Sequence, residues 1–329
     1  GSKRRNMGER LKLSVVIPTH NTRKLTLNCL AALWLCNPQP DEVIVVDDGS
    51  TDNTAQSVVR KYPRHIVVRL PRNEGFTAAV NHGVARASGD LVLLLNSDTE
   101  PEPTALGAVY EAFATHPDLG IAGAALRDPE GTPQWSGGRT PSALWCFAMA
   151  SGLPALLGKW NLWRKLRPPS GSGGGDVDWV AGTAMVVRRA VWSQVGPFDT
   201  GYRFYCQDLD LCFAAASAGW KVEILPDFKI LHLHGGTISE EAGSVGSQHP
   251  ELMWTDLLRF ANKHWGPRRA RSSNRALRMG AALRVIGRSI ASPLIGDRDS
   301  NEWSEATTAY TQALHALDDQ DQGEQGPVV

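Results

Sequence analysis

The N-terminal part of the chain alternates between short apolar runs and longer amphipathic segments. The apolar runs at 13–17, 42–46, 66–70 and 90–95 have the length and composition of strands that are buried on both faces. Helices are predicted between them at 23–35, 54–60 and 75–87. A single helix between successive strands predicts βαβ units. The sequence therefore predicts an α/β fold in which helices flank a mostly parallel, Rossmann-like sheet.

Polar side chains follow three of these predicted strands. Thr19 and Asn21 follow the first strand, Asp48 ends the second, and Asp98 follows the fourth. The carboxyl ends of parallel strands meet at one edge of a sheet, where such folds bind their ligands. We therefore expect a binding site at this edge. The alternatives are that Asp48 only shapes a turn and that Asp98 only caps the next helix.

Several functional classes do not fit the sequence. The turn after the first strand is Pro-Thr-His-Asn, which lacks the Gly-x-Gly-x-x-Gly of a dinucleotide-binding dehydrogenase, and the chain contains no Gly-x-x-x-x-Gly-Lys-Ser/Thr phosphate loop. A formal net charge of +0 gives no argument for nucleic acid as a partner. The five cysteines are scattered, which favours reduced thiols in a cytosolic setting over disulfides or zinc.

Four segments in the first half carry a family resemblance. In order they read VVIPTHN, VIVVDDGSTDNT, RNEGFTAAVNHGVARASGD and LVLLLNSDTEPEP. Together they resemble the nucleotide-binding half of a family 2 glycosyltransferase, a family that has the GT-A fold and transfers sugars with inversion. The later segments VDWVAGTAMVVRRAVWSQVGPFD, YCQDLDLCFAAASAGWKV and HLHGG follow the order of the rhamnosyltransferase-like branch.

The resemblance implies a nucleoside-diphosphate sugar as donor, with dTDP-rhamnose favoured and a UDP-sugar next, and Mn²⁺ or Mg²⁺ as cofactor. A hard cation with oxygen ligands can stabilise the charge that develops on a departing diphosphate. The resemblance assigns Asp98 to the metal and Asp48 to N3 of the base. It also implies a histidine ligand, either His232 or His234, with a slight preference for His234. The other donor-site residues that it implies are Pro18, Thr19, Asn21, Arg72, Asn73, Asn96 and Ser97.

An inverting transfer also needs a general base that deprotonates the acceptor hydroxyl. The resemblance assigns this role to Asp208, at the start of a predicted helix; the alternative is that Asp208 only caps that helix. The family usually has Glu where this chain has Gln207, and an amide there lowers the local negative charge and can alter the orientation of the acceptor. The residues expected to face the donor sugar and acceptor are Asp178, Trp179, Gly182, Thr183 and Gln207. Trp179 could instead be a core residue, and Gly182 and Thr183 are predicted to lie inside a strand.

Residues 1–10 are predicted to be a flexible N-terminus that begins with a Gly-Ser cloning remnant. We expect a nucleotide-sugar-binding half at 11–130, an acceptor-binding and catalytic half at 131–250, and an Arg-rich helical extension with an acidic tail at 251–329. The basic and apolar segments 156–167 and 268–288 fit a membrane surface, a packed or solvated helix, or an oligomer contact.

Family members often use lipid-linked acceptors. The expected acceptor is therefore a glycan or a lipid-linked glycan. We expect the protein to be cytoplasmic, with peripheral contact at the inner face of the cell membrane. No apolar run reaches the roughly 18–20 residues of a membrane-spanning helix. Two other functions stay open at this point. A nucleotidyltransferase would need a Gly-rich basic loop after the first strand, and a non-catalytic sugar-nucleotide or glycan-binding protein is compatible with Gln207.

Overall fold

The computed structural model describes residues 10–153, 175–203, 205–233, 250–291, 308–315 and 317. The chain divides into two compact units, which we call the sheet unit and the helical unit. The sheet unit comprises Gly1–Gly138, Pro168–Asp199 and Asp208–Thr237. The helical unit comprises Arg139–Arg167, Thr200–Gln207 and Ile238–Val329.

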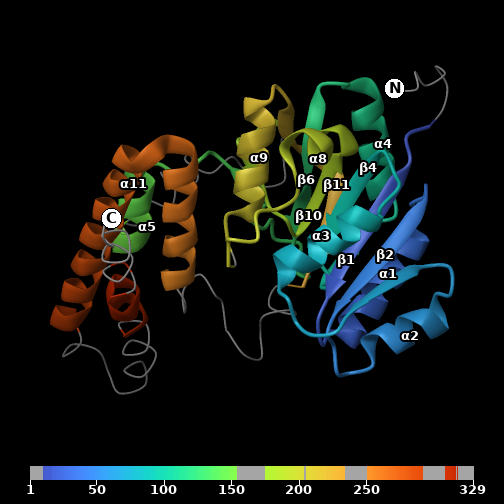
Figure 1. Cartoon of the computed structure of the whole chain (residues 1–329), viewed down its shortest axis with the longest axis horizontal. Helices are drawn as coiled ribbons and strands as arrows, with labels where there is room; N and C mark the ends of the chain where they lie inside the picture. Colours follow the sequence, from blue (N-terminus) through green and yellow to red (C-terminus); the bar gives the residue numbers. More distant parts are fainter. Residues whose placement is uncertain are drawn as a thin grey trace, which may run out of the picture. The chain divides into compact units, whose positions relative to one another are not determined.

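The parallel strands predicted from the apolar runs are confirmed. They lie in the order β3 (Ile66–Leu70), β2 (Glu42–Asp48), β1 (Leu13–Thr19) and β4 (Leu91–Leu95), and every neighbouring pair is parallel. Each strand is an apolar run because side chains on both of its faces meet helices. Figure 1 shows β1, β2 and β4 running through the middle of the sheet unit.

The remaining strands extend the sheet beyond β4. Strand β10 (Ala184–Arg188) runs antiparallel between β4 and β6 (Leu119–Arg127). Strand β11 (Lys221–His232) is parallel to β6 and also pairs with β5 (Thr99–Pro101) and β8 (Gly175–Asp176). The short strands β7 (Gly137–Gly138) and β9 (Trp179–Val180) form a separate pair.

One strand prediction was wrong. Gly182 and Thr183 were expected inside a strand, but they lie in the turn between β9 and β10. The physical reason is that their backbone groups are used elsewhere. Gly182 donates its N–H to Asp208, and the carbonyl of Thr183 accepts from Asn96.

Helices cover both faces of the sheet, as predicted. On one face, α1 (Arg23–Leu35) and α4 (Ala105–Thr115) contribute buried side chains to one core, and α2 (Thr54–Lys61) adds Val58. On the other face, α3 (Phe76–Arg86), α8 (Arg189–Val195) and α9 (Gln207–Ser217) contribute to a second core. At the start of α2, the side chain of Asn53 makes no capping bond, and Asp52 accepts from the N–H of Thr54 at 3.0 Å.

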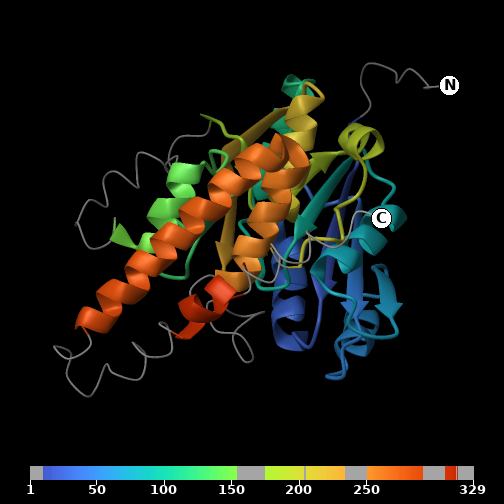
Figure 2. The ribbon, with the colours of Figure 1, turned by 60° about the vertical axis from the view of Figure 1, so that its left-hand side comes forward.

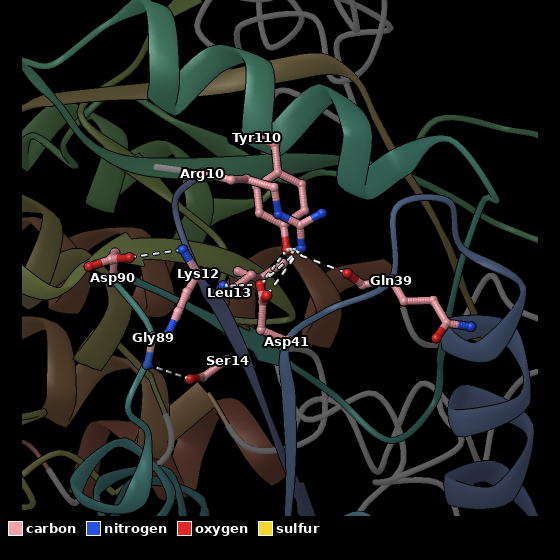
Figure 3. Close-up of polar contacts among 9 residues, drawn as sticks. All are labelled: Arg10, Lys12, Leu13, Ser14, Gln39, Asp41, Gly89, Asp90 and Tyr110. Atoms are coloured by element: carbon pink, nitrogen blue, oxygen red, sulfur yellow. Dashed lines mark hydrogen bonds and ion pairs between the residues drawn. The ribbon is translucent and has the colours of Figure 1, made fainter. Parts of the chain in front are cut away.

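A polar cluster ties the elements together at the amino end of β1 (Figure 3). Asp41 accepts from the N–H of Leu13 at 2.9 Å, from the Tyr110 hydroxyl at 2.9 Å and from Arg10 at 3.1 Å. Burial opposes ionisation of Asp41, but these hydrogen bonds outweigh it and hold its pKa below the ordinary value. The cluster lies at the end of β1 opposite Thr19, so we regard it as structural.

The helical unit contains α5 (Ala143–Ser151), α11 (Pro250–Ala291) and a helical stretch at 308–315. Helix α11 is sharply kinked at Gly266, which has φ 76° and ψ 173° and is followed by Pro267. None of the helices that the structure describes has the length and hydropathy of a bilayer-crossing segment. The basic segment 156–167, residue 234 and nearly all of the acidic tail lie outside the described residues.

Candidate functional site

A buried hydroxyl network joins the carboxyl ends of β1 and β4. The Thr19 hydroxyl lies 2.7 Å from the hydroxyls of both Thr22 and Thr26, and Thr22 lies 3.0 Å from that of Ser97. Thr19 and Ser97 are 3% and 1% exposed. Their hydroxyls therefore fix the start of α1 against the end of β4. Pro18, the residue before Thr19, is buried in β1 opposite Val46 of β2.

The loops after β1 and β2 are held together mainly by Asn21. Its backbone adopts φ 52°, a conformation that asparagine tolerates better than most residues. The Asn21 side-chain oxygen accepts from the N–H of Thr51 at 2.8 Å, and its own N–H donates to the Ser50 hydroxyl at 2.9 Å. In addition, Nδ1 of His20 lies 2.6 Å from the carbonyl oxygen of Asp48. These contacts connect the loop after β1 to the end of β2 and the loop that follows it.

Asp48 is a buried carboxylate that organises the loop before α3. One oxygen accepts from the N–H of Glu74 at 2.7 Å and the other from the N–H of Gly75 at 2.9 Å. Asp48 is only 4% exposed, and hydrogen bonds to a charged acceptor are the strong kind that can offset burial. It therefore does more than shape its own turn, because it links the end of β2 to the first residues before α3.

Gly49 allows the same loop to approach the end of β2 closely. It has φ 70°, and a Cβ added there would lie 2.5 Å from the carbonyl carbon of Arg72 and 2.7 Å from the nitrogen of Asn73. Any side chain at this position would displace the loop. The loop therefore brings Arg72 and Asn73 to the carboxyl end of β2, where both are exposed.

The loop after β4 contains two buried oxygens that lack partners. Among the described residues, neither Oδ1 of Asn96 nor Oδ1 of Asp98 has a hydrogen-bond partner. Asp98 is 3% exposed, and an uncompensated carboxylate at such a position is strongly unfavourable. The capping interpretation fails, because α4 begins only at Ala105, with Thr104 rather than Asp98 as its cap residue. A cation beside Asp98 would compensate such a carboxylate.

His232 lies beside Asp98, at the end of β11. Its Nε2 is 3.7 Å from Oδ2 of Asp98, and its Nδ1 is 2.6 Å from Oε1 of Gln134. The amide nitrogen of Gln134 donates to the carbonyl oxygen of His232 at 3.2 Å, which fixes the orientation of the Gln134 amide. Nδ1 of His232 must then carry the hydrogen, so in the neutral ring the Nε2 lone pair is on the side of Asp98.

Gln134 could not be recognised from the sequence, because it lies 98 residues from His232 along the chain. Of the two histidines considered, the structure brings His232 to Asp98. His234, the slightly preferred one, falls outside the described residues. Among the described residues, no three acid, histidine or cysteine side chains gather into a metal site. A cation at Asp98 and His232 would therefore need further ligands from substrate or water, as Mg²⁺ sites commonly have.

Asp208 is held at the start of α9 by two backbone N–H groups. One oxygen accepts from Gly182 at 3.0 Å and the other from Leu209 at 2.8 Å. Burial raises the pKa of Asp208 and outweighs these two hydrogen bonds, which act in the opposite direction. Asp208 thus lies at the start of the helix, as a capping residue would, but its bond to Gly182 also fixes it to the β9–β10 turn. A carboxylate with a raised pKa suits a general base.

The other residues expected to contact sugar or acceptor lie on neighbouring elements. Trp179 is half-buried and packs edge-on against Trp135, with ring centroids 5.0 Å apart, so it belongs partly to the core. The N–H of Asp178 donates to the carbonyl of Gly138 at 2.9 Å. Gln207 is 8% exposed, and its Oε1 has no hydrogen-bond partner among the described residues.

Comparison with known proteins gives the chain a family. The model of "Glycosyl transferase family 2" matches residues 14–192, which is more than half of the 329 residues. The N-acetylglucosaminyl-diphospho-decaprenol L-rhamnosyltransferase of Mycobacterium tuberculosis is 29% identical over 274 residues, which cover 77% of this chain and 85% of the relative.

Solved structures give the same fold at low sequence identity. The mannosyltransferase PcManGT of Pyrobaculum calidifontis, in complex with GDP-Man and Mn²⁺, matches with a TM-score of 0.58 and 15% identity, over 97% of this chain and 89% of that one. GalNAc-T7 with UDP, GalNAc and Mn²⁺ matches with a TM-score of 0.59 and 15% identity, over 91% and 55% of the two chains. The expected GT-A-type fold is thus confirmed, and the chain is a glycosyltransferase that belongs to family 2 and is similar to a rhamnosyltransferase.

Proposed function

We propose that this enzyme is an inverting, divalent-metal-dependent transferase that moves a sugar from a nucleoside-diphosphate donor to a hydroxyl of a glycan or lipid-linked glycan. The observation that carries the proposal is the buried carboxylate of Asp98, which has one oxygen without a partner among the described residues and lies 3.7 Å from Nε2 of His232. In the neutral ring, the lone pair of Nε2 and the carboxylate oxygen Oδ2 of Asp98 repel each other unless a cation lies near both.

The residues present fit a hard or borderline divalent cation. Asp98 supplies an oxygen ligand and His232 a neutral imidazole nitrogen, a pair that suits Mn²⁺ and accommodates Mg²⁺. When bound, such an ion would stabilise the negative charge of a nucleoside-diphosphate leaving group. Asn96, whose side-chain oxygen also lacks a partner, would accept a hydrogen bond from the ribose or from water near the cation.

The ends of β1 and β2 would hold the donor nucleotide. Each oxygen of Asp48 accepts one backbone N–H and retains a lone pair, so it can also accept from N3 of a uracil or thymine base. Arg72 and Asn73 are exposed and lie in the loop that packs against Gly49, and from there they would contact the base or the diphosphate. Pro18, Thr19, Asn21 and Ser97 would shape this pocket mainly through the loops that they hold in place.

Asp208 would act as the base in a single displacement. It would take the proton from the acceptor hydroxyl as that oxygen attacks the anomeric carbon on the face opposite the diphosphate, and this gives inversion. A base of this kind contributes about 10²–10⁴-fold to the rate. The unpartnered Oε1 of Gln207 would accept a hydrogen bond from another acceptor hydroxyl. Trp179, Gly182, Thr183 and Asp178 would border the space for the two sugars.

The relative from Mycobacterium tuberculosis suggests the substrate classes to test first. Its name describes rhamnose transfer to an N-acetylglucosaminyl-diphospho-decaprenol. For this chain we therefore favour dTDP-rhamnose as donor, a UDP-sugar next, and a polyprenyl-diphosphate-linked sugar as acceptor. The lipid-linked acceptor would place the enzyme at a membrane surface.

The direct test is turnover with Mn²⁺, using dTDP-rhamnose or UDP-sugars as donor and a polyprenyl-diphosphate-linked N-acetylglucosamine as acceptor. Asp208→Asn should lower kcat by about 10²–10⁴-fold while nucleotide binding persists. Asp227→Asn is the matched control, because Asp227 is an acid on β11 with an 82% exposed side chain, and it should leave turnover unchanged. Equal rates for Asp208→Asn and the wild type would refute the role of Asp208.

A further inference from the structure

The C-terminal half of α11 carries a row of exposed apolar side chains. Met279, Leu283, Ile286 and Ile290 are 66%, 42%, 57% and 71% exposed. Spacings of four, three and four residues place them within about 60° of the circumference of an α-helix. We call these four residues the apolar stripe. Figure 2 shows this half of α11 as the long orange helix beside the green α5.

Another face of the same helix already makes the contacts that hold the helical unit together. Leu277 and Ala281 are fully buried. A Cβ added to Gly280 would lie 2.6 Å from the carbonyl oxygen of Phe147, which shows how closely α5 packs here. A surface helix of a globular domain normally has one apolar face, directed at the core. The apolar stripe is therefore a second apolar face, which stays exposed among the described residues.

The charged residues of this half of α11 are all arginines. The sequence from Pro267 to Ala291 contains no Asp or Glu. Its arginines include four that are exposed: Arg268, Arg269, Arg271 and Arg275. At 3.6 residues per turn, Arg268 and Arg275 lie within about 60° of the middle of the apolar stripe. Arginine can bury its aliphatic stem beside apolar groups while its guanidinium contacts phosphate.

We propose that the apolar stripe and these exposed arginines form a docking surface for a bilayer that contains anionic phospholipids. The helix would lie in the plane of the headgroups, with the apolar stripe toward the acyl chains and the guanidinium groups at the phosphates. A second copy of this chain is a poorer occupant, because pairing through the apolar stripe would bring two rows of arginines together. The proposal goes beyond sugar transfer, since it concerns the surface on which the enzyme is held.

The test is flotation of the full-length protein with vesicles of phosphatidylcholine alone or mixed with phosphatidylglycerol. The wild type should bind only the mixed vesicles, and added salt should weaken binding. The double variant Leu283→Glu/Ile286→Glu should lower the partition coefficient by about tenfold or more. Arg268→Gln/Arg271→Gln/Arg275→Gln should lower it about a hundredfold. Val59→Glu is the matched control, because Val59 is an exposed apolar residue on α2 (54%) and its replacement should change nothing.

Three outcomes would overturn the proposal. In the first, the wild type fails to bind anionic vesicles. In the second, the Leu283→Glu/Ile286→Glu variant binds them as well as the wild type does. In the third, the wild type is a dimer without lipid and the Leu283→Glu/Ile286→Glu variant is a monomer. The first outcome needs no variant, so it stands even if a substitution disturbs folding, which thermal unfolding would reveal. Nucleotide binding by the Leu283→Glu/Ile286→Glu variant should equal that of the wild type. This separates failure of the docking surface from failure of the proposed transfer reaction.

Discussion

At the scale of single residues, buried polar groups mark the site more clearly than exposed ones. The carboxylates of Asp48 and Asp98 are buried and Asp208 is half-buried, and the surroundings of the three differ. Backbone N–H groups occupy both oxygens of Asp48 and of Asp208, whereas one oxygen of Asp98 has no partner among the described residues. These differences are compatible with the three proposed roles, in which Asp48 holds a loop and a base, Asp208 accepts a proton and Asp98 binds a cation.

The raised pKa of Asp208 predicts a particular pH dependence. A general base works only when it is ionised, so kcat/KM should fall with decreasing pH, with a midpoint above the ordinary pKa of an aspartate. The profile should be recorded with Mn²⁺ saturating at every pH. An acid limb at the ordinary aspartate value, or the same limb in Asp208→Asn, would contradict the assignment.

The same pKa shift has a consequence for stability. Because the folded-state pKa of Asp208 exceeds its unfolded value, this group favours the folded state at a pH below the unfolded pKa. That contribution is lost as the pH rises through the folded pKa. The ionised form that works as a base is therefore the form that burial destabilises.

Gln134 gives a second prediction at this scale. Replacing it with Leu removes both the acceptor for Nδ1 of His232 and the donor to its carbonyl, so the ring can rotate or change tautomer. We expect Gln134→Leu to weaken Mn²⁺ binding in the presence of dTDP by about 10–100-fold, measured by electron paramagnetic resonance.

Gln194→Leu is a suitable control for this experiment. Gln194 accepts from the Trp220 ring nitrogen at 2.9 Å in an exposed pair and has no contact with His232. Its replacement should leave Mn²⁺ binding unchanged. Unaltered Mn²⁺ affinity in Gln134→Leu would show that Gln134 does not position the histidine.

At the scale of elements, local sequence was enough for the parallel strands and their helices. The apolar run of β4 and the turn residues after β2 are local signals, and the structure has strands and helices close to the expected bounds. The position of β10 between β4 and β6 could not be predicted, because strand pairing depends on contacts distant in sequence. For the same reason Gln134 could not be recognised from the sequence, because it lies between β6 and β7 and its partner His232 lies at the end of β11.

The packing of α3 on the sheet gives a prediction at the element scale. Gly83 lies where α3 crosses β1 and β2, and an added Cβ would overlap Cγ1 of Val16 and lie 3.0 Å from Cγ2 of Val46. Valine side chains in a buried strand cannot move away easily. Gly83→Ala should therefore lower the free energy of unfolding by about 1–3 kcal/mol, measured by urea denaturation.

Gly107 in α4 is the matched helical glycine. The nearest atom to an added Cβ there is Cδ of Pro38 at 3.7 Å, an ordinary contact distance. Gly107→Ala should be neutral or stabilise by up to about 1 kcal/mol, because alanine favours the helix. Equal free energies of unfolding for Gly83→Ala and Gly107→Ala would contradict the prediction that the close packing of α3 on the sheet leaves no room for a side chain at Gly83.

At the scale of the whole molecule, the chain separates its tasks between two units. The sheet unit holds nearly all of the predicted donor, metal and base residues, since they follow neighbouring strands. The helical unit joins Arg139–Arg167 and Thr200–Gln207 to the C-terminal residues, so it draws on more of the chain than the extension expected at 251–329. The family could be identified from motifs in sequence order, whereas the second apolar face of α11 required the exposure of each side chain.

The most direct measurement is calorimetric titration of dTDP, UDP and GDP into the wild type and Asp98→Asn, each with and without Mn²⁺. The account predicts that dTDP or UDP binds the wild type and that Mn²⁺ strengthens this binding. Asp98→Asn should lose the effect of Mn²⁺, while Asp227→Asn should retain it. Equal Mn²⁺ dependence in Asp98→Asn, or no nucleotide binding by the wild type under either condition, would contradict the central claim that Asp98 holds the metal of a sugar-nucleotide site.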